Sequence, residues 1–114
     1  MLDYYILKDG PQPRETIQAT TEEWILWWTS HADQRRVAQD SILTSKGLAN
    51  VSTVFLSLDH GWDGQVLLFE TMIFPDGSWL EQYCERYATE AEALDGHHRI
   101  VENLLVNQKP DSQL

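Results

Sequence analysis

Hydrophobic and polar residues alternate along several short stretches of the chain, and this period of two predicts β-strands. The run at 66–74 is apolar on both faces apart from Glu70 and Thr71, which is typical of a central strand. The run at 35–42 alternates more weakly and is expected at an edge of the sheet. In all, strands are predicted at residues 2–8, 35–42, 51–60, 66–74 and 79–87.

Two stretches lack this alternation and are predicted to be connections. Residues 9–19 open with an Asp-Gly-Pro turn signal and contain Pro11 and Pro13, neither of which can donate to a strand ladder. Residues 44–50 contain Gly47 and are interpreted as a loop.

The first helix is expected to begin after Thr20. Thr20 and Glu23 have the spacing of a capping box, in which each side chain bonds the backbone N–H of the other residue. Aromatic residues then recur at i, i+3, i+4 and i+7, which predicts a helix that ends near residues 32–33. This helical face holds Trp24, Trp27, Trp28 and His31.

The second helix has a similar start. Thr89 and Glu92 form another capping-box pattern, so the helix is predicted to begin at about Glu90. His97 lies at the centre of its apolar stripe, with His98 on the flank. The stripe comprises Ala93, His97, Ile100, Val101 and Leu104.

These elements predict an α+β fold with the order β-α-β-β-β-β-α. Four to five strands form a mostly antiparallel sheet, and two helices pack on it. A single domain is expected over residues 1–106, followed by a polar tail at residues 107–114.

Composition narrows the range of partners. The 114 residues include 18 acidic and 8 basic side chains, and the net charge of −10 disfavours direct contact with nucleic acid or an anionic membrane. The single cysteine, Cys84, excludes an intramolecular disulfide and fits a reducing cytoplasm. No apolar run approaches the roughly 20 residues that span a bilayer, so no membrane partner is expected.

Four side chains are candidates for a ligand-binding site. Asp59 and His60 end a predicted strand at a turn, Glu70 lies within an apolar strand, and His97 lies on the last helix. If they converge, they could bind or hydrolyse a small ligand such as a nucleotide derivative. The chain has no His-x-x-x-His or Cys-x-x-Cys spacing, so no metal ligand, cofactor or catalytic residue is assigned.

Each candidate also has a structural interpretation, which is the favoured one. A histidine on an apolar helix stripe, such as His97, is more often buried and hydrogen-bonded than a ligand. Asp59 is expected to accept hydrogen bonds from turn amides. Glu70 needs a partner inside the sheet, and Arg36 or Arg86 could supply it.

The tryptophans indicate a protein-binding surface. Trp24, Trp27 and Trp28 together exceed what one face of a short helix can bury in so small a domain, so a surplus ring is expected at the surface. Exposed tryptophan is a frequent anchor in protein interfaces. The sequence therefore predicts either a partner-protein site or a homodimer contact on this helix.

Three strings in the chain resemble a known group of proteins. They are VSTVFL at residues 51–56, LDH at 58–60 and LLFETM at 67–72, followed by ERYAT at 85–89 and a helix that contains Gly96-His97. They resemble small uncharacterised proteins of tailed bacteriophages and prophages. The resemblance implies a phage-encoded protein in the cytoplasm of a bacterial host, and it implies no activity or site residue.

The favoured hypothesis is a small acidic phage accessory protein that binds a host or phage protein, for instance to inhibit a host defence system, and that is not an enzyme. One alternative is a small-ligand binder or hydrolase that uses the four candidate side chains. Another is a DNA mimic whose carboxylates imitate phosphates. Helix starts account for some of the acidic residues, which counts against mimicry.

Overall fold

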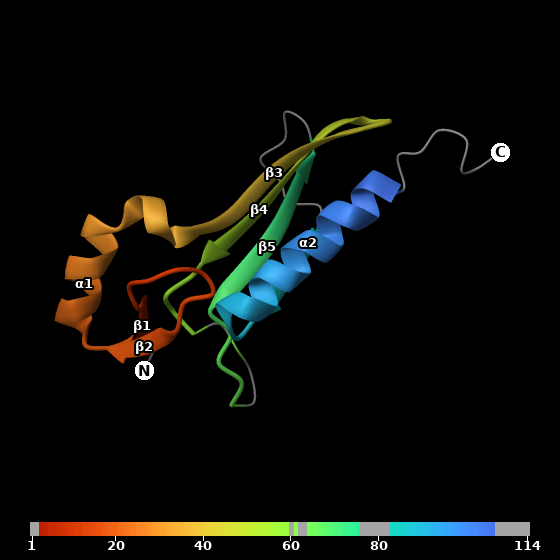
Figure 1. Cartoon of the computed structure of the whole chain (residues 1–114). Coiled ribbons are helices and arrows are strands. Elements are labelled where there is room, and N and C mark those ends of the chain that lie inside the picture. The colour runs from red at the N-terminus through yellow and green to blue at the C-terminus, as the bar shows by residue number, and fades with distance from the viewer. Residues whose placement is uncertain (1–2, 60, 62–63, 76–82, 107–114) are drawn as a thin grey trace.

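The computed structural model describes residues 3–59, 61, 64–75 and 83–106. Its larger sheet has four strands in chain order, each antiparallel to the next. Helix α2 (Glu90–Val106) runs along one face of this sheet and contacts all four strands (Figure 1). The strands are β3 (Arg36–Thr44), β4 (Gly47–Phe55), β5 (Phe69–Pro75) and β6 (Tyr83–Tyr87). The predicted α+β class and its mostly antiparallel sheet are confirmed.

The β3–β4 hairpin is longer than predicted. Residues 44–50 do not form a loop, because the ladder continues to the pair Thr44 and Gly47 and leaves only a tight turn. Gly47 has a φ of 109°, in the region that favours glycine, and the Thr44 hydroxyl donates to its carbonyl at 2.6 Å. The glycine therefore permits the turn of a hairpin, and the loop prediction was wrong.

Alternate residues of β4 face α2. Val51, Thr53 and Phe55 are fully or almost fully buried, whereas the residues between them are half-buried. The helix buries Glu90, Ala93, Gly96, His97 and Ile100 in return. The predicted start of the helix and the core of its buried stripe are confirmed.

The N-terminal third gathers at one end of the large sheet (Figure 1). Strand β1 (Tyr4–Leu7) pairs antiparallel with β2 (Thr16–Ala19), and the two form a separate small sheet. The prediction of a continuous connection over residues 9–19 was therefore wrong for its last part. The prolines end at residue 13, which leaves room for a short strand after them.

Helix α1 (Thr21–Ser30) has the predicted capping box. Thr20 Oγ1 accepts from the backbone N–H of Glu23 at 3.2 Å, and Glu23 Oε1 accepts from the N–H of Thr20 at 2.8 Å. The helix ends slightly earlier than predicted, and a 3₁₀ turn, η1 (Ala32–Arg35), leads into β3. Neither helix within the described ranges combines the length and apolarity needed to cross a bilayer.

The core joins the N-terminal elements to the large sheet. Trp27 packs edge-on against Phe55 with 5.5 Å between ring centroids, and Phe55 contacts Phe69 at 5.2 Å. Trp24 Nε1 donates to Ser57 Oγ at 2.7 Å, just beyond the end of β4. Apolar and polar contacts together fix α1 against the end of β4.

Three predicted features fall outside the described residues. They are His60, the tail at residues 107–114, and the first part of the strand predicted at 79–87. Within the described residues, that last strand covers Tyr83–Tyr87.

Candidate functional site

The structure separates Glu70 from His97. Glu70 pairs with Val54 across the β4–β5 ladder, on the sheet face turned away from α2. Its neighbour Thr71 points to the opposite face and joins the side chains around His97. Because successive strand residues face opposite sides, these two candidates cannot contribute to one site.

Glu70 belongs to a structural ion pair. The side chain is buried, and its Oε2 accepts from Arg86 Nε at 2.7 Å and from Cys84 Sγ at 3.1 Å. Arg86 is one of the two partners that the sequence predicted, so this pairing is confirmed. A buried carboxylate with a charge-assisted partner needs no ligand to explain it.

The Asp59 carboxylate stabilises the loop that follows β4. Its Oδ1 accepts from the backbone N–H of Gly61 at 2.8 Å and from that of Leu67 at 3.1 Å. These two bonds join the opposite sides of the loop, as expected for an aspartate that closes a turn. Because His60 lies outside the described residues, its role beside Asp59 stays a prediction.

His97 is the centre of a hydrogen-bonded chain that crosses the large sheet. Its Nε2 lies 2.7 Å from Asp40 Oδ2, and its Nδ1 lies 2.7 Å from Thr53 Oγ1. Thr53 Oγ1 is 2.5 Å from Thr71 Oγ1, to which the Tyr87 hydroxyl donates at 3.1 Å. Each of the four strands supplies one member of this chain, so His97 ties α2 to the whole sheet.

The ends of this chain set the direction of its hydrogen bonds. A carboxylate only accepts, so His97 Nε2 carries the proton that faces Asp40. In the tautomer with Nδ1 unprotonated, that nitrogen accepts from Thr53. Thr71 then donates to Thr53, and Tyr87 donates to Thr71. Burial raises the pKa of Tyr87 to about 12, so its phenol remains a donor at neutral pH. In this arrangement every member of the chain has a hydrogen-bond partner.

The order Thr53, His97, Asp40 resembles the hydroxyl–imidazole–carboxylate relay of hydrolases. A nucleophile must reach a substrate, yet Thr53 is 0% exposed and His97 is 2% exposed. Neither of two surface hollows formed by described residues is lined by them. In the described ranges, no three His, Cys, Asp or Glu side chains group closely enough to hold a metal ion. The geometry therefore supports a structural role for His97.

Replacing His97 with leucine is expected to lower the free energy of unfolding by about 1–3 kcal/mol, because buried hydroxyls lose their partner. The matched control is His98→Leu on the exposed neighbour, for which a change within about 0.5 kcal/mol is expected. Chemical denaturation followed by circular dichroism measures both. Equal stability of the two variants would contradict the structural role.

A second buried polar cluster fixes the loop before β2. Glu90 is fully buried, and its Oε1 accepts from the backbone N–H of Arg14 at 2.7 Å and from Arg14 Nε at 3.0 Å. Its Oε2 accepts from the same guanidinium at 2.6 Å, while Gln12 Nε2 donates to the carbonyl of Val37 at 3.1 Å. Burial raises the pKa of Glu90, but the bonds from Arg14 outweigh it and hold the pKa below its ordinary value.

No local pattern in the sequence predicted this cluster. Glu90 was expected at a helix start, which is also true, and Arg14 was expected in an irregular connection. The two residues are 76 positions apart, so no local pattern links them. The proline-rich loop was the one available signal, because a loop that packs inside a fold needs partners for its backbone groups.

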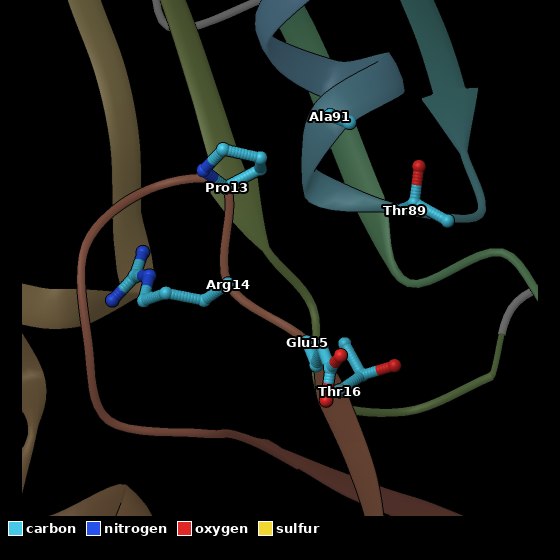
Figure 2. Close-up of a pocket in the computed structure, with 6 residues that line it drawn as sticks. All are labelled: Pro13, Arg14, Glu15, Thr16, Thr89 and Ala91. Carbon is cyan, nitrogen blue, oxygen red and sulfur yellow. The ribbon is translucent and has the colours of Figure 1, made fainter.

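An open hollow of about 450 Å³ lies beside this cluster (Figure 2). The loop before β2 forms one wall, and the start of α2 forms the other. Its lining residues are Pro13, Arg14, Glu15, Thr16, Thr89 and Ala91. The two buried nitrogens that lack a partner in the described chain belong to Trp27 and Arg35, and neither lines the hollow. The hollow therefore indicates no particular ligand.

Similarity to known proteins does not assign a site. No protein-family model, curated protein or solved structure matches the chain.

The tryptophans of α1 face the molecule more than the solvent. Trp27 is buried, whereas Trp24 and Trp28 are half-buried. Trp24 stacks on Tyr4 with 4.6 Å between ring centroids, and the guanidinium of Arg35 lies 3.7 Å above the ring of Trp28. The three tryptophan rings therefore mainly hold α1 against the rest of the molecule.

The opposite face of α1 carries its exposed apolar side chains. Leu26 is 71% exposed and Ile25 is 48% exposed. Glu22 and Glu23 precede Leu26 by one turn and flank it on the helix surface. The period of the tryptophans predicted a contact surface on those three rings and not on Ile25 and Leu26. The position of these two residues between the periodic tryptophans was the available signal.

Proposed function

We propose that the protein acts by binding another protein through the α1 face, the outward surface formed by Glu22, Glu23, Ile25, Leu26 and Thr29. The observation that carries this proposal is the exposure of two large apolar side chains, Leu26 and Ile25, on the outward half of an ordered helix. Large apolar side chains exposed on the same outward half of an element are a feature of protein-binding surfaces, whereas a single one is ordinary.

The anchoring of α1 supports this proposal. A capped N-terminus, the tryptophan contacts with the core and the stacked Arg35 hold the helix in one position. A preorganised surface loses less conformational entropy when it binds, which favours affinity.

The charge around Leu26 indicates the chemistry of the partner. Glu22 and Glu23 both lie at the edge of the apolar pair, and no basic residue occupies the last turn of α1. A complementary surface has an apolar pocket for Leu26 and lysine or arginine at its rim. The net charge of −10 favours association with such a basic protein surface and disfavours nucleic acid.

The sequence resemblance supplies the proposed setting. In that setting, the chain is an accessory protein of a phage or prophage in the cytoplasm of a bacterial host, and it binds a host or phage protein. Inhibition of a host defence system is the specific form of this proposal.

The two alternatives have less support. A ligand site that uses Glu70 and His97 is disfavoured because these side chains lie on opposite sides of the sheet. A DNA mimic needs its carboxylates in an exposed row. Glu70 and Glu90 are instead buried in ion pairs, so they cannot belong to such a row.

A binding experiment with host extract tests the proposal. The partner recovered with the wild-type protein should be lost with Leu26→Asp. Binding would move the charge of the aspartate from water into the apolar pocket that accepts Leu26, which costs free energy. With that partner purified, Leu26→Asp should weaken the affinity by about 30-fold or more, the range of an interface hot spot. Isothermal titration calorimetry measures this change.

Leu105→Asp is the matched control, because Leu105 is an exposed leucine on the other helix. It should bind like the wild type. Retention of the same partner by Leu26→Asp at unchanged affinity would refute the α1 face as the contact surface.

A further inference from the structure

The hydrogen-bonded chain around His97 ends on a carboxylate at both sides of the sheet. Besides its bond to Thr71, the Tyr87 hydroxyl also forms a side-chain hydrogen bond with Glu85. Glu85 lies two residues before Tyr87 on β6, so strand alternation places both side chains on the sheet face that α2 covers. The chain therefore runs from Asp40 on β3 to Glu85 on β6.

Glu85 is an acceptor at neutral pH. Burial raises the pKa of Glu85, but hydrogen bonds from Tyr83, Tyr87 and Arg99 outweigh burial and hold the pKa below its ordinary value. Tyr83 donates to its Oε2 at 2.6 Å, and Arg99 of α2 donates to its Oε1. The Glu85 side chain is 26% exposed, so protons from water can reach this end of the chain.

The number of protons decides whether every link of the chain is made. Five links connect, in order, Asp40, His97, Thr53, Thr71, Tyr87 and Glu85. With a neutral ring, the imidazole and the three hydroxyls carry four protons, so the Tyr87 proton serves either Thr71 or Glu85. An imidazolium supplies a fifth proton, and every link then contains one.

We propose that this chain is a proton relay whose hydrogen bonds reverse direction when His97 becomes charged. A proton from water binds Glu85 and passes to the Tyr87 oxygen. The Tyr87 proton moves to Thr71, the Thr71 proton moves to Thr53, and the Thr53 proton moves to Nδ1 of His97. Each hydroxyl oxygen loses one O–H bond and gains another, and Glu85 is again a carboxylate, so only the ring has gained a charge. Afterwards Nδ1 donates to Thr53, and the bonds continue in that direction until Tyr87 donates to Glu85.

The charged ring has a negative partner at each end of the chain. Its Nε2 lies 2.7 Å from Asp40 Oδ2, which is the distance of a charge-assisted hydrogen bond. In the described chain, the titratable groups that meet the ring or the relay are Asp40 from β3, Tyr87 and Glu85 from β6, and Arg99 from α2 beside Glu85. Strands β4 and β5 contribute only threonine hydroxyls. Burial opposes a charge on a ring that is 2% exposed, so the charged state depends on these partners.

The relay connects the two outer strands of the large sheet. Asp40 belongs to β3 at one edge, and Glu85 belongs to β6 at the other. Proton uptake by His97 turns the Tyr87 hydroxyl from Thr71 to Glu85, the same carboxylate that binds Arg99 of α2. A proton bound at the centre of the helix is thereby communicated to an ion pair between the helix and β6. This device lies inside the fold and is independent of the α1 face.

Nuclear magnetic resonance of protein labelled with ¹⁵N and ¹³C tests the proposal during an acid titration. The His97 ring should gain a second protonated nitrogen as the pH falls, while circular dichroism shows that the protein stays folded. The Tyr87 Cζ and Glu85 Cδ signals should change with the same midpoint as His97, because one relay moves all three. The exposed neighbour His98 is the internal reference for a ring outside the chain.

Tyr87→Phe interrupts the relay and is the decisive variant. In the charged state it leaves the Thr71 hydrogen without an acceptor, so the midpoint of His97 protonation should fall by about 0.5 pH units or more, the equivalent of one hydrogen bond. Tyr83→Phe is the matched control, because Tyr83 donates to the same carboxylate but lies outside the relay. Its His97 midpoint should equal that of the wild type.

Three results overturn the proposal. The first is a His97 ring that keeps a single proton until the protein unfolds. The second is an equal His97 midpoint in the Tyr87→Phe and Tyr83→Phe variants, which shows that the hydroxyl chain does not carry the effect. The third is a Tyr87 or Glu85 signal that changes at a pH different from that of His97.

Discussion

Glu90→Gln is expected to lower the free energy of unfolding by about 3–5 kcal/mol, the largest effect of any single change considered for this chain. Glu90 is fully buried and receives three hydrogen bonds from Arg14. The neutral glutamine leaves the buried Arg14 guanidinium without a counter-charge, and an uncompensated buried charge costs that much. Denaturant titration at neutral pH measures the loss.

Glu102→Gln is the matched control for Glu90→Gln. Glu102 lies on the exposed side of the same helix, so its change should stay within about 0.5 kcal/mol. If the two variants lose similar stability, the ion pair with Arg14 does not hold the loop in place.

The stability provided by Glu90 should also depend on pH. The folded state lowers the pKa of Glu90, so its contribution is fully present above the pKa of the unfolded chain and is lost as the pH falls through the folded pKa. The stability difference between the wild type and Glu90→Gln should therefore be greatest at neutral pH and shrink in acid. A difference that grows in acid would show the opposite sign of linkage.

Gly96→Ala is expected to destabilise the protein by about 2–3 kcal/mol, although alanine is the better helix former by roughly 1 kcal/mol. A Cβ at this position would lie 2.3 Å from the Tyr87 hydroxyl oxygen and 2.4 Å from its ring carbon Cε1. Tyr87 is buried and bonded to Thr71, so it cannot move aside cheaply. Thermal and denaturant unfolding measure the net effect.

Substitutions at Tyr87 identify the cause of that effect. Tyr87→Phe should not rescue Gly96→Ala, because the ring carbons that meet the new Cβ remain. Tyr87→Val removes the ring and should make Gly96→Ala neutral or stabilising in the double variant. A stabilising Gly96→Ala in the wild-type background would refute the close packing of the helix on this ring.

Local signals in the sequence predicted most of the elements. The capping box at Thr20 and Glu23 fixed the start of α1, and the period of aromatic residues fixed its inward face. The pattern around His97 likewise predicted a buried histidine, which its 2% exposure confirms. Such signals succeed because capping and periodicity involve residues within one or two turns of each other.

The errors in the secondary structure have a common physical origin. Gly47 and the prolines before β2 are local markers of irregular chain, yet each borders a strand. A glycine can mark an irregular loop or the turn of a hairpin. For Gly47, its φ of 109° and its pairing with Thr44 show that it belongs to a hairpin. Pairing is a long-range property, so no local marker reveals it.

The candidate ligand site shows the same limit. Glu70 and Thr71 are adjacent in sequence, but the pleat of β5 places them on opposite sides of the sheet. Thr71 therefore joins His97, while Glu70 joins Arg86. The face of the sheet on which α2 packs depends on contacts with all four strands. No single segment of the sequence therefore shows which face the helix covers.

The sequence by itself determined the fold class, both helices and their inward faces, because these depend on short-range periodicity and capping. The tertiary structure alone decided which polar groups meet: Asp40 with His97, and Arg14 with Glu90 across 76 positions. It also decided which apolar side chains remain exposed, namely Leu26 on α1 and Leu43 on β3. Contacts and exposure depend on how distant segments pack, and for this reason the surface proposed to bind a partner emerged only from the folded chain.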